Sequence, residues 1–417
     1  MSLRTIFAAA TFGLALLPCF AEEPAKKELP KKTDAQAAKE ISEAIRLAPA
    51  WLWAEGKSRD DLRKSLETRE VLDRPLTKAQ AKALLDTLAA GNPFLTDKTN
   101  SGVMEVPTGT DGEVTKVWFQ LPPGYKPGRD KPPGLVIALH GGPAPDFKTA
   151  FVTAPQEHSY WTGPAAKQKL ILCSPGWIGD PTRIVMETIE GAAKRWSVDR
   201  SRIWLVGHSA GGVGSFMVGP PNADRFAGIA PFVCGMEHGD RLKNAFHFGV
   251  YHVLGKKDNA FFLSTGRKNS EKLKEAGGPL EVVEKDGGHD VYPDECDKSL
   301  TWLAARPRNF WSKDIRWSRD GARTEGGFFW FDPYAKGATG AFTAKVDGNT
   351  ITITGARPAE ILLADALVDL DKPVTVLVEG EGAFQGDVKR TLRAALEWVE
   401  TRRDFSAVPV AKIAIKP

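Results

Sequence analysis

At the centre of the sequence stands Gly207-His208-Ser209-Ala210-Gly211-Gly212. The apolar residues 202–206 before it end in β-favouring residues, and residues 213–218 after it have the pattern of a helix. A strand, G-x-S-x-G and a helix in this order are typical of a nucleophile elbow, a tight turn that strains the backbone of the serine. Side chains two positions before and after the serine would collide there, which explains the two glycines. We therefore expect the Ser209 hydroxyl to project above the end of a sheet.

Two residues further along the chain have the chemistry that such a serine needs. A serine hydroxyl is a weak nucleophile, so it requires a base within reach and an acid that orients the base. Asp258 ends a turn after the strand pattern at 248–254, and His289 ends a glycine turn after the strand pattern at 280–284. We assign Ser209 as nucleophile, His289 as general base and then acid, and Asp258 as the carboxylate that fixes the imidazole.

The assignment of the base rests on position, because the sequence contains seven histidines. His289 follows the last strand pattern of the core, where serine hydrolases of this chain order carry their histidine. The best competing base and acid are His238 and Asp240, which lie between two earlier strand patterns.

Backbone N–H groups near the serine are expected to form an oxyanion hole, since a tetrahedral intermediate needs two or more donors. One donor is the N–H of Ala210, directly after the nucleophile at the start of the helix. The other is expected in His140-Gly141-Gly142, where absent side chains let the backbone approach a substrate, and we assign Gly142. His140 is expected to brace that loop.

Strand and helix patterns alternate between residues 111 and 305. Apolar runs predict strands, and a helix with one apolar face is predicted at 182–196. This alternation predicts an α/β domain with a doubly wound, mostly parallel sheet. Residues 114–121 alternate as an edge strand would. The predicted strands lie at residues 135–139, 170–172, 203–206, 226–233, 248–254 and 280–284.

Two regions flank this predicted domain. Residues 22–110 begin with a leader rich in Lys, Glu and Pro, expected to be disordered, and continue as a helical extension whose third helix starts at Thr77. Residues 306–417 contain short alternating runs separated by turns, with one helix at 388–402. They predict an antiparallel, β-sandwich-like C-terminal domain. Its tryptophans suit either a core or a carbohydrate-binding platform, and they are Trp311, Trp317 and Trp330.

Four motifs together resemble the alpha/beta-hydrolase superfamily. They are LHGG at 139–142, VDRSRIWLVGHSAGG at 198–212, GKKD at 255–258 and GH at 288–289. Within the superfamily, the chain is similar to secreted bacterial esterases of the polyhydroxybutyrate depolymerase and feruloyl esterase type, and to the catalytic domain of prolyl oligopeptidases. The resemblance covers residues 111–305. It implies acyl transfer through a covalent acyl-enzyme, without metal or cofactor.

The sequence indicates the substrate less clearly than the type of reaction. Loop position suggests that Trp177, His238 and Phe261 bind substrate, and their aromatic walls suit an aromatic acyl group or a sugar face, or ordinary packing. We expect a carboxylic ester, either a small molecule or polymer-linked. The alternatives are a prolyl-oligopeptidase-like serine peptidase, which the absence of a β-propeller pattern disfavours, and a non-catalytic protein that binds polysaccharide or a surface.

Composition and the N-terminal residues suggest where the protein works. A net charge of +4 in 417 residues gives no basis for a nucleic-acid partner. Residues 1–21 combine one early arginine, an apolar core and a small residue, which predicts a signal peptide cleaved after Ala21 and a secreted or periplasmic protein. A lipoprotein anchor at Cys19 is an alternative that Pro18 fits poorly. No other stretch is apolar enough to cross a membrane.

Three cysteines remain after such a cleavage, so at most one disulfide can form within the chain. Cys173 and Cys234 each end an apolar run and are expected to be buried free thiols. The spacing of Cys and His residues matches no zinc motif.

Overall fold

The computed structural model describes residues 33–68, 70–319, 327–332 and 340–415. The predicted signal peptide, Cys19 and most of the predicted leader lie outside these residues.

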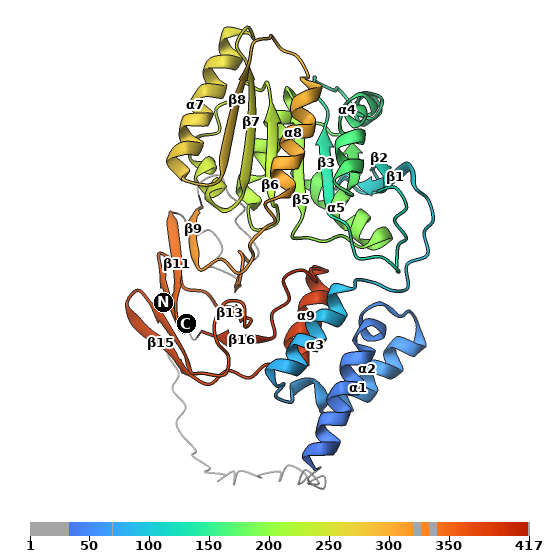
Figure 1. Cartoon of the computed structure of the whole chain (residues 1–417), viewed down its shortest axis with the longest axis vertical. Helices are drawn as coiled ribbons and strands as arrows, with labels where there is room; N and C mark the ends of the chain where they lie inside the picture. Colours follow the sequence, from blue (N-terminus) through green and yellow to red (C-terminus); the bar gives the residue numbers. More distant parts are fainter. Residues whose placement is uncertain (1–32, 69, 320–326, 333–339, 416–417) are drawn as a thin grey trace, which may run out of the picture.

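A mostly parallel, eight-stranded sheet forms the upper part of the molecule (Figure 1). Its strand order is β1-β2-β4-β3-β5-β6-β7-β8, and the six strands from β4 to β8 in that order run parallel. The inner strands are continuously apolar because helices cover both faces. The strands are β1 (Ser101–Pro107), β2 (Val114–Gln120), β3 (Leu135–Leu139), β4 (Ile171–Pro175), β5 (Ile203–His208), β6 (Gly228–Phe232), β7 (Gly249–Gly255) and β8 (Leu280–Lys285). The predicted α/β fold class is confirmed.

Helices pack on the two faces of this sheet in two separate apolar clusters. Side chains of α4 (Phe147–Lys167) and α8 (Pro293–Ala304) share one cluster. Side chains of α5 (Thr182–Trp196), α6 (Ala210–Val218) and α7 (Ala260–Ala276) share the other. A short 3-10 helix, η2 (Pro220–Asn222), follows α6, and η3 (Gly239–His247) links β6 to β7. The sheet is therefore doubly wound, and because its strands from β4 to β8 run parallel, their carboxyl ends lie at one edge.

Two features near the start of the sheet differ from the sequence-based expectation. β1 lies inside the segment 22–110 and pairs antiparallel with β2, with Gly102 opposite Phe119 and Val106 opposite Thr115. The expectation that residues 114–121 form an edge strand is wrong, because β2 is paired on both sides, with β1 and with β4. Only alternate residues of β1 are buried, so its apolar signal is short and weak.

The described residues of the C-terminal region form two sheets. One has five strands in the order β15-β14-β12-β11-β9, and the other has three in the order β10-β13-β16. The expectation of purely antiparallel pairing is wrong at one place, since β12 and β14 run parallel. Trp317 and Trp330 are buried in the core and Trp311 packs against it. The strands are β9 (Asp314–Ser318), β10 (Phe331–Asp332), β11 (Ala341–Asp347), β12 (Thr350–Thr354), β13 (Glu360–Leu363), β14 (Val374–Val378), β15 (Glu381–Gly386) and β16 (Ala411–Ala414).

The N-terminal helices are α1 (Asp34–Trp53), α2 (Lys57–Thr68), the short η1 (Val71–Asp73) and α3 (Lys78–Ala89). Thr77 caps α3 in a capping box with Gln80, as its sequence position predicts. These helices lie beside α9 (Leu392–Arg402) of the C-terminal region, below the eight-stranded sheet (Figure 1).

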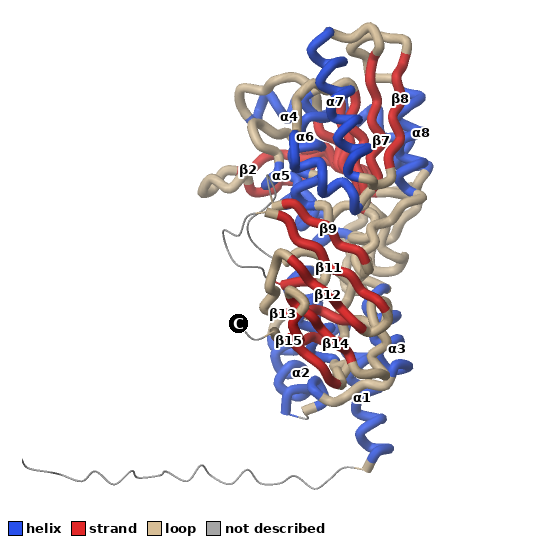
Figure 2. The backbone as a smooth tube through the Cα atoms, turned by 90° about the vertical axis from the view of Figure 1, so that its left-hand side faces the viewer, coloured by secondary structure: helices blue, strands red, loops and turns tan. Residues whose placement is uncertain are grey.

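Hydrogen bonds join the two ends of the chain. The N–H of Leu76 donates to the carbonyl of Arg390 at 2.9 Å, and the guanidinium of Arg393 binds both oxygens of Asp73 at 2.6 and 2.7 Å. Figure 2 shows the resulting elongated molecule, with the eight-stranded sheet at one end and the N-terminal helices and C-terminal sheets at the other.

Candidate active site

The turn between β5 and α6 holds Ser209 in a strained conformation, with φ 54° and ψ −115°. The N–H of Ser209 donates to the carbonyl of Phe232 at 2.9 Å, which fixes the turn against β6. A Cβ added to Gly207 would lie 2.5 Å from the carbonyl oxygen of Leu139, and one added to Gly211 would lie closer still to that oxygen. Only glycine fits at either position, because the backbone of β3 passes beside the turn.

His289 and Asp258 face each other across the ends of β7 and β8. Nδ1 of His289 lies 2.9 Å from Oδ2 of Asp258, whose side chain is only 3% exposed. The two turns are tied together by the N–H of Lys257, which donates to the carbonyl of Gly287 at 2.8 Å. Since Nδ1 faces a carboxylate, Nε2 is the nitrogen that remains to interact with another group.

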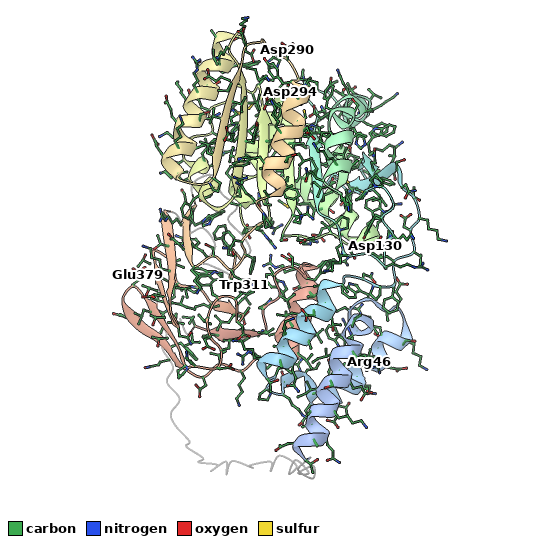
Figure 3. All side chains as sticks on the ribbon, in the orientation of Figure 1. Arg46, Asp130, Asp290, Asp294, Trp311 and Glu379 are labelled. Atoms are coloured by element: carbon green, nitrogen blue, oxygen red, sulfur yellow. The ribbon has the colours of Figure 1, made fainter. Side chains whose placement is uncertain are left out.

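A pocket of about 170 Å³ contains both Ser209 and His289. Its other walls come from the loop after β3, the end of β6 and one face of α4. The lining residues besides Ser209 and His289 are His140, Gly141, Thr153, Gln156, Glu157, Tyr160, His208, Val233, Asp290 and Val291. Asp290 lies at the top of the molecule in Figure 3, whereas Glu379 lies near mid-height and Arg46 in the lower part, and none of the lining residues comes from the described flanking regions. The described flanking regions therefore do not cover this pocket.

The loop after β3 is braced as expected. Nδ1 of His140 lies 3.1 Å from the carbonyl oxygen of Gly141, and the N–H of Trp177 donates to Nε2 of His140 at 3.3 Å. Burial lowers the pKa of His140 below its usual range, which keeps the ring neutral.

The backbone groups assigned to the oxyanion hole lie on two sides of the serine. Ala210 is the first residue of α6, so its N–H is one of the amides that have no acceptor within the helix. Gly141 approaches the serine, since a Cβ on it would lie 3.5 Å from Cβ of Ser209. Gly142 follows with a φ of 74° and does not line the pocket.

The three residues expected to bind substrate do not line this pocket. Trp177 is buried and packs on the His140 ring, with 5.4 Å between ring centroids. His238 is buried against Phe216 at 4.9 Å. Phe261 is 58% exposed at the start of α7.

The neighbouring aromatic residue, Phe262, does reach the histidine. Its ring centroid lies 4.9 Å from that of His289 and 5.9 Å from that of Phe261. These two rings therefore form an apolar surface beside the His289 ring.

The competing base and acid are not brought together. Asp240 is paired with Lys243 at 2.9 Å. The N–H of His238 donates to the side chain of Asn269, and burial lowers the pKa of His238 to about 4.

Sequence reasoning missed one wall of the pocket, the face of α4 that carries Thr153, Gln156, Glu157 and Tyr160. Two internal prolines, Pro155 and Pro164, obscure the helix in the sequence. The spacing of these four residues is that of one helical face, which is the signal that would have indicated them.

Within the described ranges, no group of three or more His, Cys, Asp and Glu side chains is arranged to hold a metal ion. In the same residues, no helix is both long and apolar enough to span a bilayer. Cys173, Cys234 and Cys296 are buried free thiols, which confirms the expectation for the first two.

No known family model matches the sequence. Among solved structures, a thermostable esterase is similar over 50% of this chain and 64% of its own chain, at 17% identity and a TM-score of 0.43. The fluorophosphonate-binding serine hydrolase F of Staphylococcus aureus is similar over 49% of this chain and 98% of its own, at 17% identity and a TM-score of 0.41. A ferulic acid esterase is similar over 50% and 99%, at 17% identity and a TM-score of 0.40.

The sheet itself identifies the fold. Its strand order, the single strand β2 that runs against all the others and the elbow after β5 are features of one architecture. The chain thus has the fold of the alpha/beta-hydrolase superfamily, as the resemblance of its motifs predicts.

Proposed function

We propose that this protein is a serine hydrolase that cleaves carboxylic esters through an acyl-enzyme intermediate. One observation carries the proposal. Ser209, on a strained elbow, and His289 line one pocket, while Nδ1 of His289 lies 2.9 Å from the buried carboxylate of Asp258. A nucleophile, a base and an acid that orients the base are the groups that acyl transfer requires.

In the proposed reaction, Oγ of Ser209 attacks the ester carbonyl while Nε2 of His289 accepts the hydroxyl proton. Asp258 holds the Nδ1–H and stabilises the imidazolium that forms. The imidazolium then donates its proton to the alkoxide leaving group as the C–O bond breaks. Water repeats the sequence on the acyl-enzyme, with His289 again as base, and regenerates Ser209.

The oxyanion of each tetrahedral intermediate is proposed to accept hydrogen bonds from the N–H of Ala210 and from the glycine loop, where Gly142 is assigned from the sequence and Gly141 is the glycine that lines the pocket. Ala210 contributes as the first residue of α6, where the helix dipole also favours negative charge. The glycine loop contributes because Gly141 brings backbone close to Ser209.

The size and walls of the pocket favour a short acyl group. Its volume of about 170 Å³ is close to the roughly 150 Å³ of a protein cavity known to hold benzene. Thr153, Gln156 and Tyr160 make one wall polar. The exposed Phe261 is proposed to contact the alcohol side of the ester at the rim, so a large or polymer-linked alcohol is accommodated outside the pocket.

Hydrolysis of p-nitrophenyl acetate, butyrate and octanoate tests the proposal. We expect the two shorter esters to be preferred, and we expect Ser209→Ala and His289→Ala to lose several orders of magnitude in kcat. A fluorophosphonate probe should label wild type and fail to label Ser209→Ala. A wild type that hydrolyses none of the three esters and is not labelled would contradict the proposal.

Short Pro- and Ala-p-nitroanilides separate the esterase from a peptidase. Amides need stronger protonation of the leaving group than activated esters do, so ester turnover alone does not decide. Cleavage of the anilides with kcat/KM comparable to that for the esters would favour the peptidase.

A further inference from the structure

A buried contact between His208 and Glu157 lies next to the proposed nucleophile, Ser209. Nδ1 of His208, the residue before Ser209, lies 2.8 Å from Oε1 of Glu157 on α4. The same carboxylate oxygen accepts the indole N–H of Trp161 at 2.8 Å. Both side chains of the pair are at least nine-tenths buried, at 7% and 4% exposure. A carboxylate buried this deeply needs such partners.

The second nitrogen of the His208 ring binds the loop that carries the proposed base. Nε2 of His208 lies 2.8 Å from the carbonyl oxygen of Val291. A carbonyl only accepts, so Nε2 carries a proton. Nδ1 faces a carboxylate oxygen, which also accepts. Both nitrogens therefore face acceptors, and all contacts are satisfied when the ring is an imidazolium beside the Glu157 carboxylate.

The groups around the His208 ring are compatible with its imidazolium form. Aromatic rings lie around His208, with centroid distances of 4.7 Å to Phe232 and 5.6 Å to Tyr160. Ring faces attract a cation. Sγ of Cys296 lies 4.0 Å from Nε2, and burial raises the pKa of that thiol, so it is neutral and adds no competing charge.

The two contacts of the His208 ring link the segments that carry the proposed nucleophile and the proposed base. His208 immediately precedes Ser209, and Val291 lies two residues after His289, so one side chain spans the two segments that must meet for proton transfer. The His289 loop is also held by the Lys257–Gly287 hydrogen bond to the Asp258 turn and by the hydroxyl of Tyr292, which donates to the carbonyl of Gly288 at 2.7 Å. The Tyr292 contact joins the loop to itself, whereas His208 joins it to the serine turn.

We propose that His208, charged and oriented by Glu157, is a positioning residue that fixes the His289 loop relative to Ser209. This inference rests on the proposed function. Misplacing catalytic groups by about 1 Å can cost on the order of a hundredfold in rate. Loss of the contact to Val291 should therefore lower kcat by a larger factor than it raises KM, because the pocket walls from α4 and from the loop after β3 remain.

Two substitutions at the same position separate this role from simple packing. His208→Gln keeps an N–H donor near the place of Nε2, whereas His208→Asn is too short to reach the Val291 carbonyl. We expect His208→Asn to lose about 10–100-fold in kcat with p-nitrophenyl butyrate, as losses of orienting partners typically do, and His208→Gln to retain most of it. Rates are divided by the number of sites that a fluorophosphonate titrates, so unfolded protein does not contribute.

His252 supplies the matched control. It is also fully buried, on strand β7 of the same sheet, which β6 separates from β5, and one of its ring nitrogens lies 2.9 Å from Oγ of Ser270. His252→Asn should lower stability and leave kcat per titrated site unchanged. Equal kcat per site in wild type, His208→Asn and His252→Asn would overturn the positioning role, whereas a wild type inert on every ester would instead refute the proposed function.

The charge on His208 has a readout that needs no activity. In protein labelled with ¹⁵N-histidine, wild type at pH 7.5 should show both ring nitrogens of His208 protonated, with the signals assigned by their loss in His208→Gln. Glu157→Gln should leave only one nitrogen protonated. A neutral His208 ring in wild type would overturn the charged state of the pair.

Discussion

Nδ1 of His289 lies 2.9 Å from Oδ2 of Asp258, and only the carboxylate of this pair is buried. A buried carboxylate beside a partly exposed imidazole holds the ring in one orientation and one tautomer. Asp258→Asn should leave the fold intact and lower kcat for p-nitrophenyl butyrate by on the order of ten-thousand-fold, because the amide stabilises the wrong tautomer.

Asp286 provides the control for that substitution. It lies on the same turn as His289, is exposed and pairs with Lys257 at 3.0 Å. Asp286→Asn should leave kcat within about twofold of wild type, since surface ion pairs contribute little. Equal losses in the two variants would argue against an orienting role for Asp258.

The glycines of the elbow should be intolerant of any side chain. Gly211→Ala would force a Cβ against the carbonyl oxygen of Leu139 in β3, where neither backbone can move without breaking the sheet. We expect it to prevent soluble expression or to lower the free energy of unfolding severely, as measured by urea denaturation. Gly191→Ala, in the middle of α5, meets its nearest atom at 3.4 Å and should instead raise the free energy of unfolding by about 0.5–1 kcal/mol.

The free energy of unfolding should fall as the pH drops below 7, and His252 contributes to this loss. Burial lowers the pKa of His252 to about 3 in the folded protein, against about 6.5 when unfolded. Between these values the unfolded state binds a proton that the folded state does not. Stability is therefore lost as pH falls from about 6.5 toward 3, by up to about 1.4 kcal/mol per pH unit. Urea unfolding from pH 7.5 to 5.0 should show a shallower loss in His252→Asn, and parallel curves would refute the prediction.

Arg308 should couple the upper part of the molecule to the C-terminal region. Its guanidinium binds Asp404 at 2.6 Å and the carbonyl of Asp224 at 2.7 Å, and both charged side chains are buried. Arg308→Met leaves the Asp404 carboxylate buried without its cation and should cost about 3–5 kcal/mol in urea unfolding. The double variant Arg308→Met/Asp404→Leu should recover most of that loss, and a double variant as unstable as the single one would contradict the argument.

The elements that sequence reasoning found are those with a local signal. Ser209 is marked by its two glycines, and Asp258 and His289 each follow a recognisable strand pattern and a glycine-containing turn, so each can be located without knowing the tertiary structure. The α4 wall could not be found in this way, because Pro155 interrupts its helical pattern and because α4 reaches the site through tertiary packing on β2, β3 and β4. Trp177 and His238 were predicted to line the site from loop position alone, which does not indicate whether a side chain turns inward. The direction of each side chain is set by packing instead, of Trp177 on His140 and of His238 on Phe216.

The hydrogen bond between Leu76 and Arg390 makes the chain topologically nested. The residues before β1 and those after α8 pack against each other, and the segment that forms the alpha/beta-hydrolase sheet lies between them in the sequence, as an inserted domain (Figure 1). Neither terminal region is therefore structurally independent of the other. Truncation at one end would expose the apolar surface that the other end buries. A shortened chain that keeps only the alpha/beta-hydrolase sheet should therefore lack both terminal regions.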